Sequence, residues 1–195
     1  VGMVFQNPDN QIIGTSVEED VAFGPENKNV EPEKIRKIVE TVLQKVRLWE
    51  RRKASPSRLS GGQKQRLATA DALAGLPGCL VLDEPTAMLD PDSRKEVINI
   101  VKELNRKEGM TIILITHHTD EVVDADRIVL MKDGKIIGDD IPKKIFADYE
   151  LLKKAKMDIP PIVELGMRLE KQQIGLEGPI LQEEEMIEKI VKLYR

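Results

Sequence analysis

Two adjacent carboxylates, Asp83 and Glu84, directly follow a short apolar run at residues 79–82. Open α/β sheets bind ligands where their parallel strands end, so carboxylates at such an edge are well placed for chemistry. One carboxylate there could hold Mg²⁺, which uses few protein oxygens and keeps its waters, and the other could act as a general base toward a water molecule. Acidic residues also end many strands simply for solubility, so this pair alone does not decide between the two interpretations.

A second candidate segment, Ser60-Gly61-Gly62-Gln63, lies directly before a helical stretch at 64–76. Glycines let a backbone approach a ligand closely, and a helix N-terminus offers free N–H groups with a positive dipole end. Ser60 fits either an N-cap or a donor to a phosphate oxygen. A bare Ser-Gly-Gly loop indicates only a helix cap, whereas the longer stretch at 59–66, Leu-Ser-Gly-Gly-Gln-Lys-Gln-Arg, is more specific.

Two continuously apolar segments, at 79–82 and 111–116, predict short strands buried on both faces of a parallel sheet. Between them, Asp90-Pro91 has the chemistry of an N-cap and a first helical turn. The helix that follows has one apolar face, formed by Val97, Ile98, Val101 and Leu104. The segments together predict a βαβ unit.

Other elements flank this unit. Residues 33–47 have the apolar spacing of a helix, with Pro32 in its first turn. Residues 127–131 and 135–138 predict a hairpin around a turn at Asp133-Gly134.

The residue pattern of the sequence changes after about residue 148. Pro160-Pro161 breaks the chain, and three glutamates at 183–185 precede apolar residues at helical spacing, namely Met186, Ile187, Ile190, Val191 and Tyr194. This tail is either a helix packed on its own domain or a helix pair for dimerisation or partner docking.

The composition narrows the function classes. The chain has 195 residues, with 30 Lys and Arg against 34 Asp and Glu, which suits one domain with a small appendage. An acidic balance argues against nucleic acid as a partner. A single cysteine, Cys79, excludes an intrachain disulfide and is expected to be a small buried residue of the strand. The apolar runs are too short to span a bilayer, and no secretory signal is evident, so we expect a soluble intracellular protein.

Five segments, in this order, resemble the motifs of the ATP-binding-cassette (ABC) ATPases. Gln6 matches the Q-loop glutamine, residues 59–66 the signature motif, residues 79–84 Walker B, residues 88–90 the D-loop, and His117 the switch histidine. The resemblance implies an α/β fold of the P-loop NTPase type, with a parallel sheet and a helical subdomain at about 28–76.

The same resemblance implies a role for each matching residue. Glu84 would act as a base toward the attacking water or would position it, and Asp83 would hold Mg²⁺ through the shell of the ion. Gln6 would sense Mg²⁺ and the water, and His117 would contact the γ-phosphate and Glu84. ATP and Mg²⁺ are therefore the expected cofactors.

The signature residues would act across a dimer. Ser60, Gly61, Gly62 and Gln63 would reach the γ-phosphate of a nucleotide bound mainly by a partner subunit, and Asp90 would link the two sites.

The phosphate-binding pattern Gly-x-x-x-x-Gly-Lys-Ser/Thr is absent from the sequence. The one Gly-Lys pair, Gly134-Lys135, lies in the predicted hairpin turn and is followed by Ile136. In the family this loop precedes the Q-loop glutamine, so we expect that Val1 is not the native start and that these residues alone are inactive. The alternative is a natural protein without the loop that needs a partner to supply it.

Within the family, residues 6–11 and 17–27 resemble the energy-coupling-factor (ECF) transporter ATPases, and residues 86–91 are typical of the branch often described as cobalt-import ATPases. The expected organisation is an ATPase domain at 1–148 and a C-terminal extension at 149–195 that helps to pair two ATPases.

The ECF resemblance implies the ATP-hydrolysing motor of a prokaryotic importer at the cytoplasmic face of the membrane. Its partners would be a second ATPase, identical or different, a membrane coupling subunit and a substrate-binding membrane subunit. The cargo would be a vitamin or a transition-metal ion of the cobalt or nickel class. A soluble ABC ATPase unrelated to transport and a non-hydrolysing interaction module are the alternatives.

One departure from the family pattern concerns Asp71, which stands in the helix after the signature where a small residue is common. It either weakens that helix or faces solvent, and the sequence does not choose between these two possibilities.

Overall fold

The computed structural model describes residues 1–172, 174 and 178–193. The chain divides into two compact units, Val1–Thr116 and His117–Arg195, which are described separately below. No helix within the described residues is both long and apolar enough to cross a membrane.

The first unit contains a parallel sheet of three strands, β1 (Gly2–Val4), β2 (Cys79–Asp83) and β3 (Thr111–Ile115), in the order β1-β2-β3. In the register of the sheet, Val4 lies beside Leu82 and Leu82 beside Leu114. The predicted βαβ unit is therefore confirmed, and strands far apart in sequence end at one common edge.

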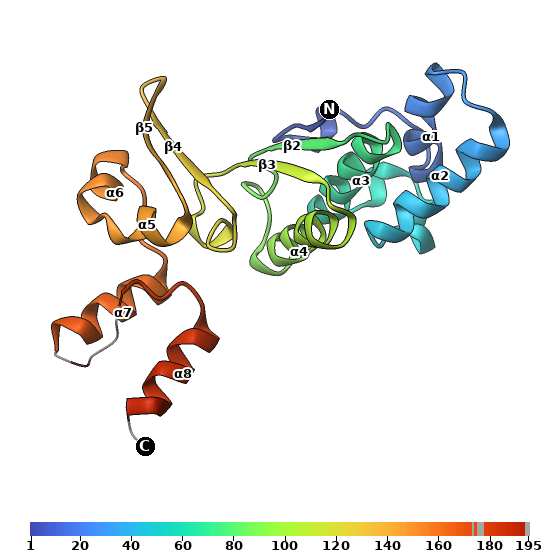
Figure 1. The fold of residues 1–195 in the computed structure, drawn as a ribbon. Coiled ribbons are helices and arrows are strands. Elements are labelled where there is room, and N and C mark those ends of the chain that lie inside the picture. Colours follow the sequence, from blue (N-terminus) through green and yellow to red (C-terminus); the bar gives the residue numbers. More distant parts are fainter. Residues whose placement is uncertain (173, 175–177, 194–195) are drawn as a thin grey trace. The chain divides into compact units, whose positions relative to one another are not determined.

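Helices cover one face of this sheet. α3 (Gly61–Ala74) and α4 (Pro91–Glu108) lie along the same side of the strands, as Figure 1 shows. Val4, Leu80 and Leu82 point into the core formed there and are fully buried.

The opposite face of the sheet is partly open in the described structure. Met3, Ile113 and Ile115 are 45%, 49% and 47% exposed. Burial on both faces is therefore a wrong prediction for the strand at 111–116, because successive side chains alternate between faces and the described helices pack on only one. Cys79 lies on the open face and is half-buried rather than buried.

Two more helices, α1 (Val17–Asn27) and α2 (Pro32–Lys45), pack with α3. α2 begins at Pro32, as predicted, because proline suits a first helical turn. α3 begins at Gly61, three residues before the predicted stretch. Single 3₁₀ turns occupy the connections at Pro8–Asn10, Trp49–Arg51 and Pro56–Arg58.

The second unit begins with a 3₁₀ turn at Thr119–Glu121 and an antiparallel hairpin of β4 (Ile128–Lys132) and β5 (Lys135–Asp140). Asp133 and Gly134 both have positive φ, 49° and 73°, as a type I′ turn requires. The predicted hairpin is confirmed. Two short helices follow, α5 (Pro142–Ala147) and α6 (Tyr149–Ala155).

The tail consists of α7 (Pro161–Lys171) and α8 (Glu183–Leu193). Met186 of α8 is buried in a small cluster with Ile180 and residues of α7, so the predicted apolar stripe packs partly within its own unit. Tyr194, assigned to the same stripe, lies outside the described residues. The division into domains at residue 148 stays a prediction.

Candidate functional site

The sheet brings Gln6 and Glu84 together. Gln6 follows β1 and Glu84 follows β2, and these neighbouring parallel strands end at the same edge. Gln6 Nε2 donates a hydrogen bond to Glu84 Oε2 at 3.3 Å. Two residues 78 positions apart in the sequence therefore meet at the edge where this type of sheet binds ligands.

The backbone of Glu84 has a conformation that is uncommon for a residue with a side chain. Its φ is +45°, and its N–H donates to the carbonyl of Ile115 at the end of β3 at 2.9 Å. Left-handed non-glycine residues cost free energy and persist where surrounding bonds hold them, often at functional sites. Glu84 is thus fixed by the ends of two neighbouring strands, and Asp83 is the last residue of β2.

The signature segment forms a reciprocal cap at the start of α3. Ser60 Oγ accepts a hydrogen bond from the N–H of Gln63 at 3.3 Å, and Gln63 Oε1 accepts one from the N–H of Ser60 at 3.0 Å. The N-cap hypothesis for Ser60 is confirmed. These two bonds use Ser60 Oγ as an acceptor and not as a donor, so they are compatible with the predicted contact to phosphate, which stays a prediction.

Gly62 is buried where α3 meets the first turn of α4. A Cβ at this position would lie 2.7 Å from both Cβ and Oγ of Ser93. At Gly61 the same addition would meet only Leu89, at 3.4 Å. The close approach explains a glycine at position 62 without reference to a ligand.

Asp90 caps α4 beside this contact, as the sequence predicts. Its Oδ1 accepts hydrogen bonds from the N–H groups of Ser93 at 3.0 Å and Asp92 at 3.2 Å. The carboxylate of Asp90 is exposed, and hydrogen bonds from Ser93 lower its pKa. The hydrogen bond from the Ser93 side chain has the larger effect, and that from its backbone N–H the next. A role for Asp90 across a dimer stays a prediction.

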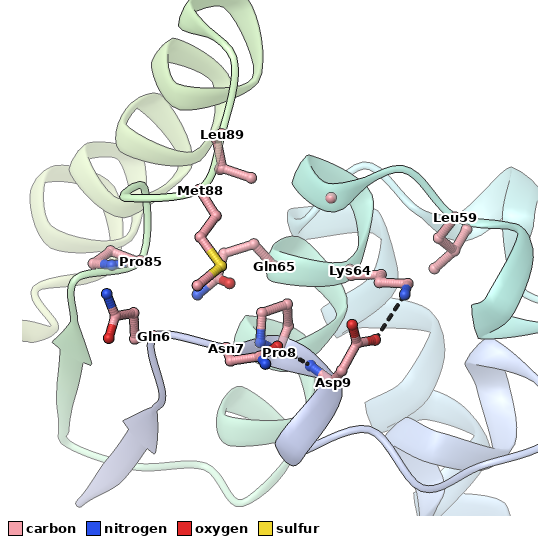
Figure 2. Close-up of a pocket in the computed structure, with 11 residues that line it drawn as sticks. Gln6, Asn7, Pro8, Asp9, Leu59, Lys64, Gln65, Pro85, Met88 and Leu89 are labelled. Atoms are coloured by element: carbon pink, nitrogen blue, oxygen red, sulfur yellow. Dashed lines mark hydrogen bonds and ion pairs between the residues drawn. The ribbon is translucent and has the colours of Figure 1, made fainter.

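A cavity of about 150 Å³ is lined by the Q-loop turn, the signature segment and the loop that precedes α4. Figure 2 shows it between the turn that carries Gln6 and Pro8, the start of α3, and the loop that carries Met88. Met88 is 70% exposed.

Two contacts that hold the Q-loop segment to α3 were not predicted from the sequence. Lys64 Nζ lies 2.7 Å from Asp9 Oδ1, as drawn in Figure 2, and Gln65 Nε2 donates to the carbonyl of Phe5 at 3.4 Å. Both α3 residues lie inside the recognised signature stretch, but their partners could be identified only once the chain was folded.

His117 is the first residue of the second unit and is exposed. Its ring centroid lies 4.1 Å from that of His118, with the rings tilted by 39°. The contact of His117 with Glu84 and with a γ-phosphate stays a prediction.

The side-chain oxygens of Asp83 and Gln6, at the edge of the sheet, are of the kind that Mg²⁺ binds. The described part of the chain contains no group of three or more His, Cys, Asp or Glu residues that could hold a metal. Mg²⁺ does not require such a group, because it keeps several waters and is bound by one or two protein oxygens together with phosphates. Asp83 and Gln6 could supply those oxygens.

The parallel sheet brings Gln6 into a hydrogen bond with Glu84, and the neighbouring α3 begins with the capped segment Ser60–Gln63. These features define the class of protein as an ABC ATPase. Residues 1–87 match the protein family described as ABC transporter. The chain belongs to the family of energy-coupling factor transporter ATP-binding proteins, as its relatives show.

Two relatives illustrate this membership. The chain is 55% identical over 191 residues to the energy-coupling factor transporter ATP-binding protein EcfA1 of Caldanaerobacter subterraneus, covering 98% of this chain and 69% of that protein. It is 50% identical over 192 residues to the EcfA1 protein of Clostridium novyi, with the same two coverages.

Two solved structures share the fold. The first is cbiO1 from Clostridium perfringens, described as part of the ABC transporter complex cbiONQ, with a TM-score of 0.72 and 38% identity over 87% of this chain and 66% of that one. The second is the ATP-binding cassette MJ0796, a dimer in a post-hydrolysis state with ADP and Pi, with a TM-score of 0.62 and 31% identity over 72% of this chain and 62% of that one.

Proposed function

We propose that the protein is the ATP-hydrolysing motor subunit of an ECF-type importer and couples ATP binding and hydrolysis to uptake of a vitamin or a transition-metal ion of the cobalt or nickel class. The observation that carries this proposal is the hydrogen bond of 3.3 Å from Gln6 Nε2 to Glu84 Oε2. It joins the Q-loop position to the carboxylate that follows the Walker B strand.

The chemistry is transfer of a phosphoryl group to water by positioning and charge neutralisation, without a covalent intermediate. Glu84 accepts a proton from the attacking water or orients it, and Gln6 holds the Glu84 carboxylate in place. The left-handed backbone of Glu84 keeps this side chain at the end of β2. His117 contacts the γ-phosphate.

Asp83 and Gln6 would hold Mg²⁺ at the sheet edge. When bound, Mg²⁺ neutralises charge on the phosphates of ATP. Ser60, Gly61, Gly62 and Gln63 bind the γ-phosphate of a nucleotide held mainly by the partner ATPase, because the N-terminus of α3 offers N–H groups and a positive dipole end. Asp90 links the two sites.

The 195 residues contain no Gly-x-x-x-x-Gly-Lys-Ser/Thr segment. Without a loop of this type to hold the β- and γ-phosphates, these residues alone should not hydrolyse ATP.

The motor works in an assembly at the cytoplasmic face of the membrane. A second ATPase, identical or different, pairs with it, partly through the extension at 149–195. A membrane coupling subunit and a substrate-binding membrane subunit complete the importer. The dimer of MJ0796 and the name of the cbiONQ complex support a paired ATPase within a larger transporter.

Reconstitution tests this proposal. The natural full-length protein would be co-purified with its membrane partners, inserted into vesicles and supplied with ATP on the ATPase side. Labelled cobalt, nickel and a panel of vitamins would be offered on the other side. We expect uptake of one cargo that requires ATP and is lost in Glu84→Gln but kept in Glu50→Gln, an exposed site outside the motifs. Uptake that proceeds without ATP would refute the motor assignment.

A further inference from the structure

Asp20 of α1 and Asp71 of α3 form a buried pair of carboxyl groups between two packed helices. Asp20 is 3% exposed. Asp71 neither faces solvent nor stands free on its helix, since both of its carboxyl oxygens are buried and its side chain is within hydrogen-bonding reach of Asp20. The expectation that Asp71 faces solvent is therefore wrong, and a weakening of α3 by Asp71 stays a prediction.

One oxygen of Asp20 binds the segment between the Q-loop and α1. Asp20 Oδ1 accepts hydrogen bonds from the N–H of Ile13 at 2.8 Å and from that of Gly14 at 2.6 Å. The approach is close, because a Cβ on Gly14 would lie 2.6–2.7 Å from backbone and side-chain atoms of Asp20. Asp20 therefore fixes the path of the chain at residues 13–14.

The other oxygens of the pair meet no donor when both groups are written as carboxylates. Asp20 Oδ2, Asp71 Oδ1 and Asp71 Oδ2 are buried without a hydrogen-bond partner. No ion pair to either residue occurs within the described residues. Two buried like charges in contact cannot both stay ionised, and each unsatisfied buried oxygen is costly.

We propose that Asp71 is protonated and donates its O–H to Asp20 Oδ2, so that the pair shares one proton and positions residues 13–14 against the signature helix. The proton supplies the donor that Asp20 Oδ2 lacks. Asp20 remains the charged acceptor for the two backbone N–H groups. Asp71 acts through Asp20, as a positioning residue.

The electrostatics of the site agree with this geometry. Burial, the charge of Asp20 and the hydrogen bond to Asp20 raise the pKa of Asp71 from 3.8 to about 9. Asp20 is the charged group of α1 that faces Asp71.

Three charged groups on other elements packed against α3 pair with residues other than Asp71. Asp9, in the 3₁₀ turn after β1, pairs with Lys64. Glu96 of α4 pairs with Arg66. From α2, Lys45 pairs with Glu108.

The shared proton predicts an unusual pH dependence of stability. The folded protein binds the proton up to about pH 9, whereas the unfolded chain releases it near 3.8. The unfolded state therefore binds fewer protons between these values, and stability falls as pH rises from about 4 to about 9. For a chain of this size the fall corresponds to roughly 3–5 °C in Tm per pH unit.

The experiment compares thermal unfolding of the natural full-length protein and its variants between pH 5 and 9. In Asp71→Asn the amide N–H replaces the carboxyl O–H as donor but does not titrate. We expect its Tm to match that of the wild type near pH 5 and to exceed it progressively toward pH 9. Asp71→Ala, which has no donor, should be less stable than Asp71→Asn throughout. Glu26→Gln, an exposed change on α1, should keep the wild-type profile.

Three results would overturn the shared proton. Parallel pH profiles for the wild type and Asp71→Asn would show that Asp71 does not titrate in this range. Equal loss of stability in Asp71→Asn and Asp71→Ala would show that a hydrogen-bond donor at position 71 does not stabilise the protein. Stabilisation by Mg²⁺ or Ca²⁺ that depends on Asp71 would replace the proton by a bound cation.

A direct observation on the unmodified protein avoids any failure of a variant to fold. Carboxyl ¹³C resonances of labelled aspartate would be followed with pH. One resonance should titrate near pH 9. The absence of any aspartate titrating above pH 7 would contradict the proposal.

Discussion

Residue identity at position 62 is explained by the distance to the neighbouring helix. A Cβ there would approach Ser93 to 2.7 Å, closer than side-chain carbons pack in folded proteins. The neighbouring Gly61 has ordinary room at 3.4 Å. The two glycines of the signature therefore differ in structural role, although the motif presents them as a pair.

Gly62→Ala should destabilise the protein by about 1–3 kcal/mol, because the backbone of α3 or α4 must shift to relieve the contact. Urea unfolding would measure this change. Gly61→Ala is the matched control and should have a smaller effect.

A double variant separates the steric contact from other effects of the alanine. Ser93→Gly removes Cβ and Oγ, the two atoms that an added Cβ would approach to 2.7 Å. Gly62→Ala should therefore cost less in the Ser93→Gly background than alone. Equal costs in both backgrounds would show that the Ser93 contact is not the reason for glycine at position 62.

The caps at Ser60 and Asp90 could be predicted from the sequence, because an N-cap depends on residues within one turn. The pairing of Asp20 with Asp71 could not. These residues are 51 positions apart, and only the packing of α1 on α3 brings them together. The meeting of Gln6 with Glu84 was predictable only through the resemblance to ABC ATPases.

At the scale of elements, Arg66 connects α3 to two other helices. Its guanidinium lies 2.9 Å from Glu96 Oε1 of α4 and donates to the carbonyls of Val46 and Arg47, at the end of α2, at 3.2 and 3.4 Å. The side chain is 9% exposed. Desolvation lowers the pKa of Arg66, and the charge of Glu96 opposes that effect.

Removal of this connection should loosen the helices around the signature. Arg66→Ala loses charge-assisted hydrogen bonds to two carbonyls and one carboxylate, and we expect a loss of roughly 2–3 kcal/mol in the free energy of unfolding. Equilibrium urea unfolding would measure it. Arg36→Ala, an exposed change on α2, should cost less than about 0.5 kcal/mol. Similar losses in both variants would contradict the role assigned to Arg66.

Elements with strong local signals were predicted well. The Asp133-Gly134 turn, the proline at the start of α2 and the cap before α4 each depend on neighbouring residues. α1 was not predicted as a helix, since Gly24 and Pro25 lie within it and obscure its pattern. Which face of the sheet is covered depends on packing between distant segments, and the apolar strand pattern did not reveal it.

At the scale of the whole molecule, the tail carries apolar side chains that its own unit does not bury. On α8, Ile187 is 61% exposed and Val191 is 44% exposed, one helical turn apart. Met186 on the same helix is buried against its own unit. α8 thus packs through one face and leaves a second apolar stripe for the proposed pairing of ATPases.

Charged substitution of that stripe should weaken pairing without unfolding the protein. We expect the double change of Ile187 and Val191 to Asp to shift the full-length ATPase pair toward monomers in analytical ultracentrifugation, with little change in Tm. Glu188→Gln, an exposed change on the same helix, should leave pairing intact. Unchanged association in the double variant would remove α8 from the interface.

The most direct test of the motor assignment is the ATPase rate of the natural full-length protein and of Glu84→Gln, with nucleotide binding measured on the same samples. The amide in Glu84→Gln keeps the size of the side chain but cannot accept a proton from water. We predict hydrolysis by the wild type, a loss of about 10²–10⁴-fold in Glu84→Gln, and ATP binding retained by both. A Glu84→Gln protein that hydrolyses ATP at the wild-type rate would contradict the account.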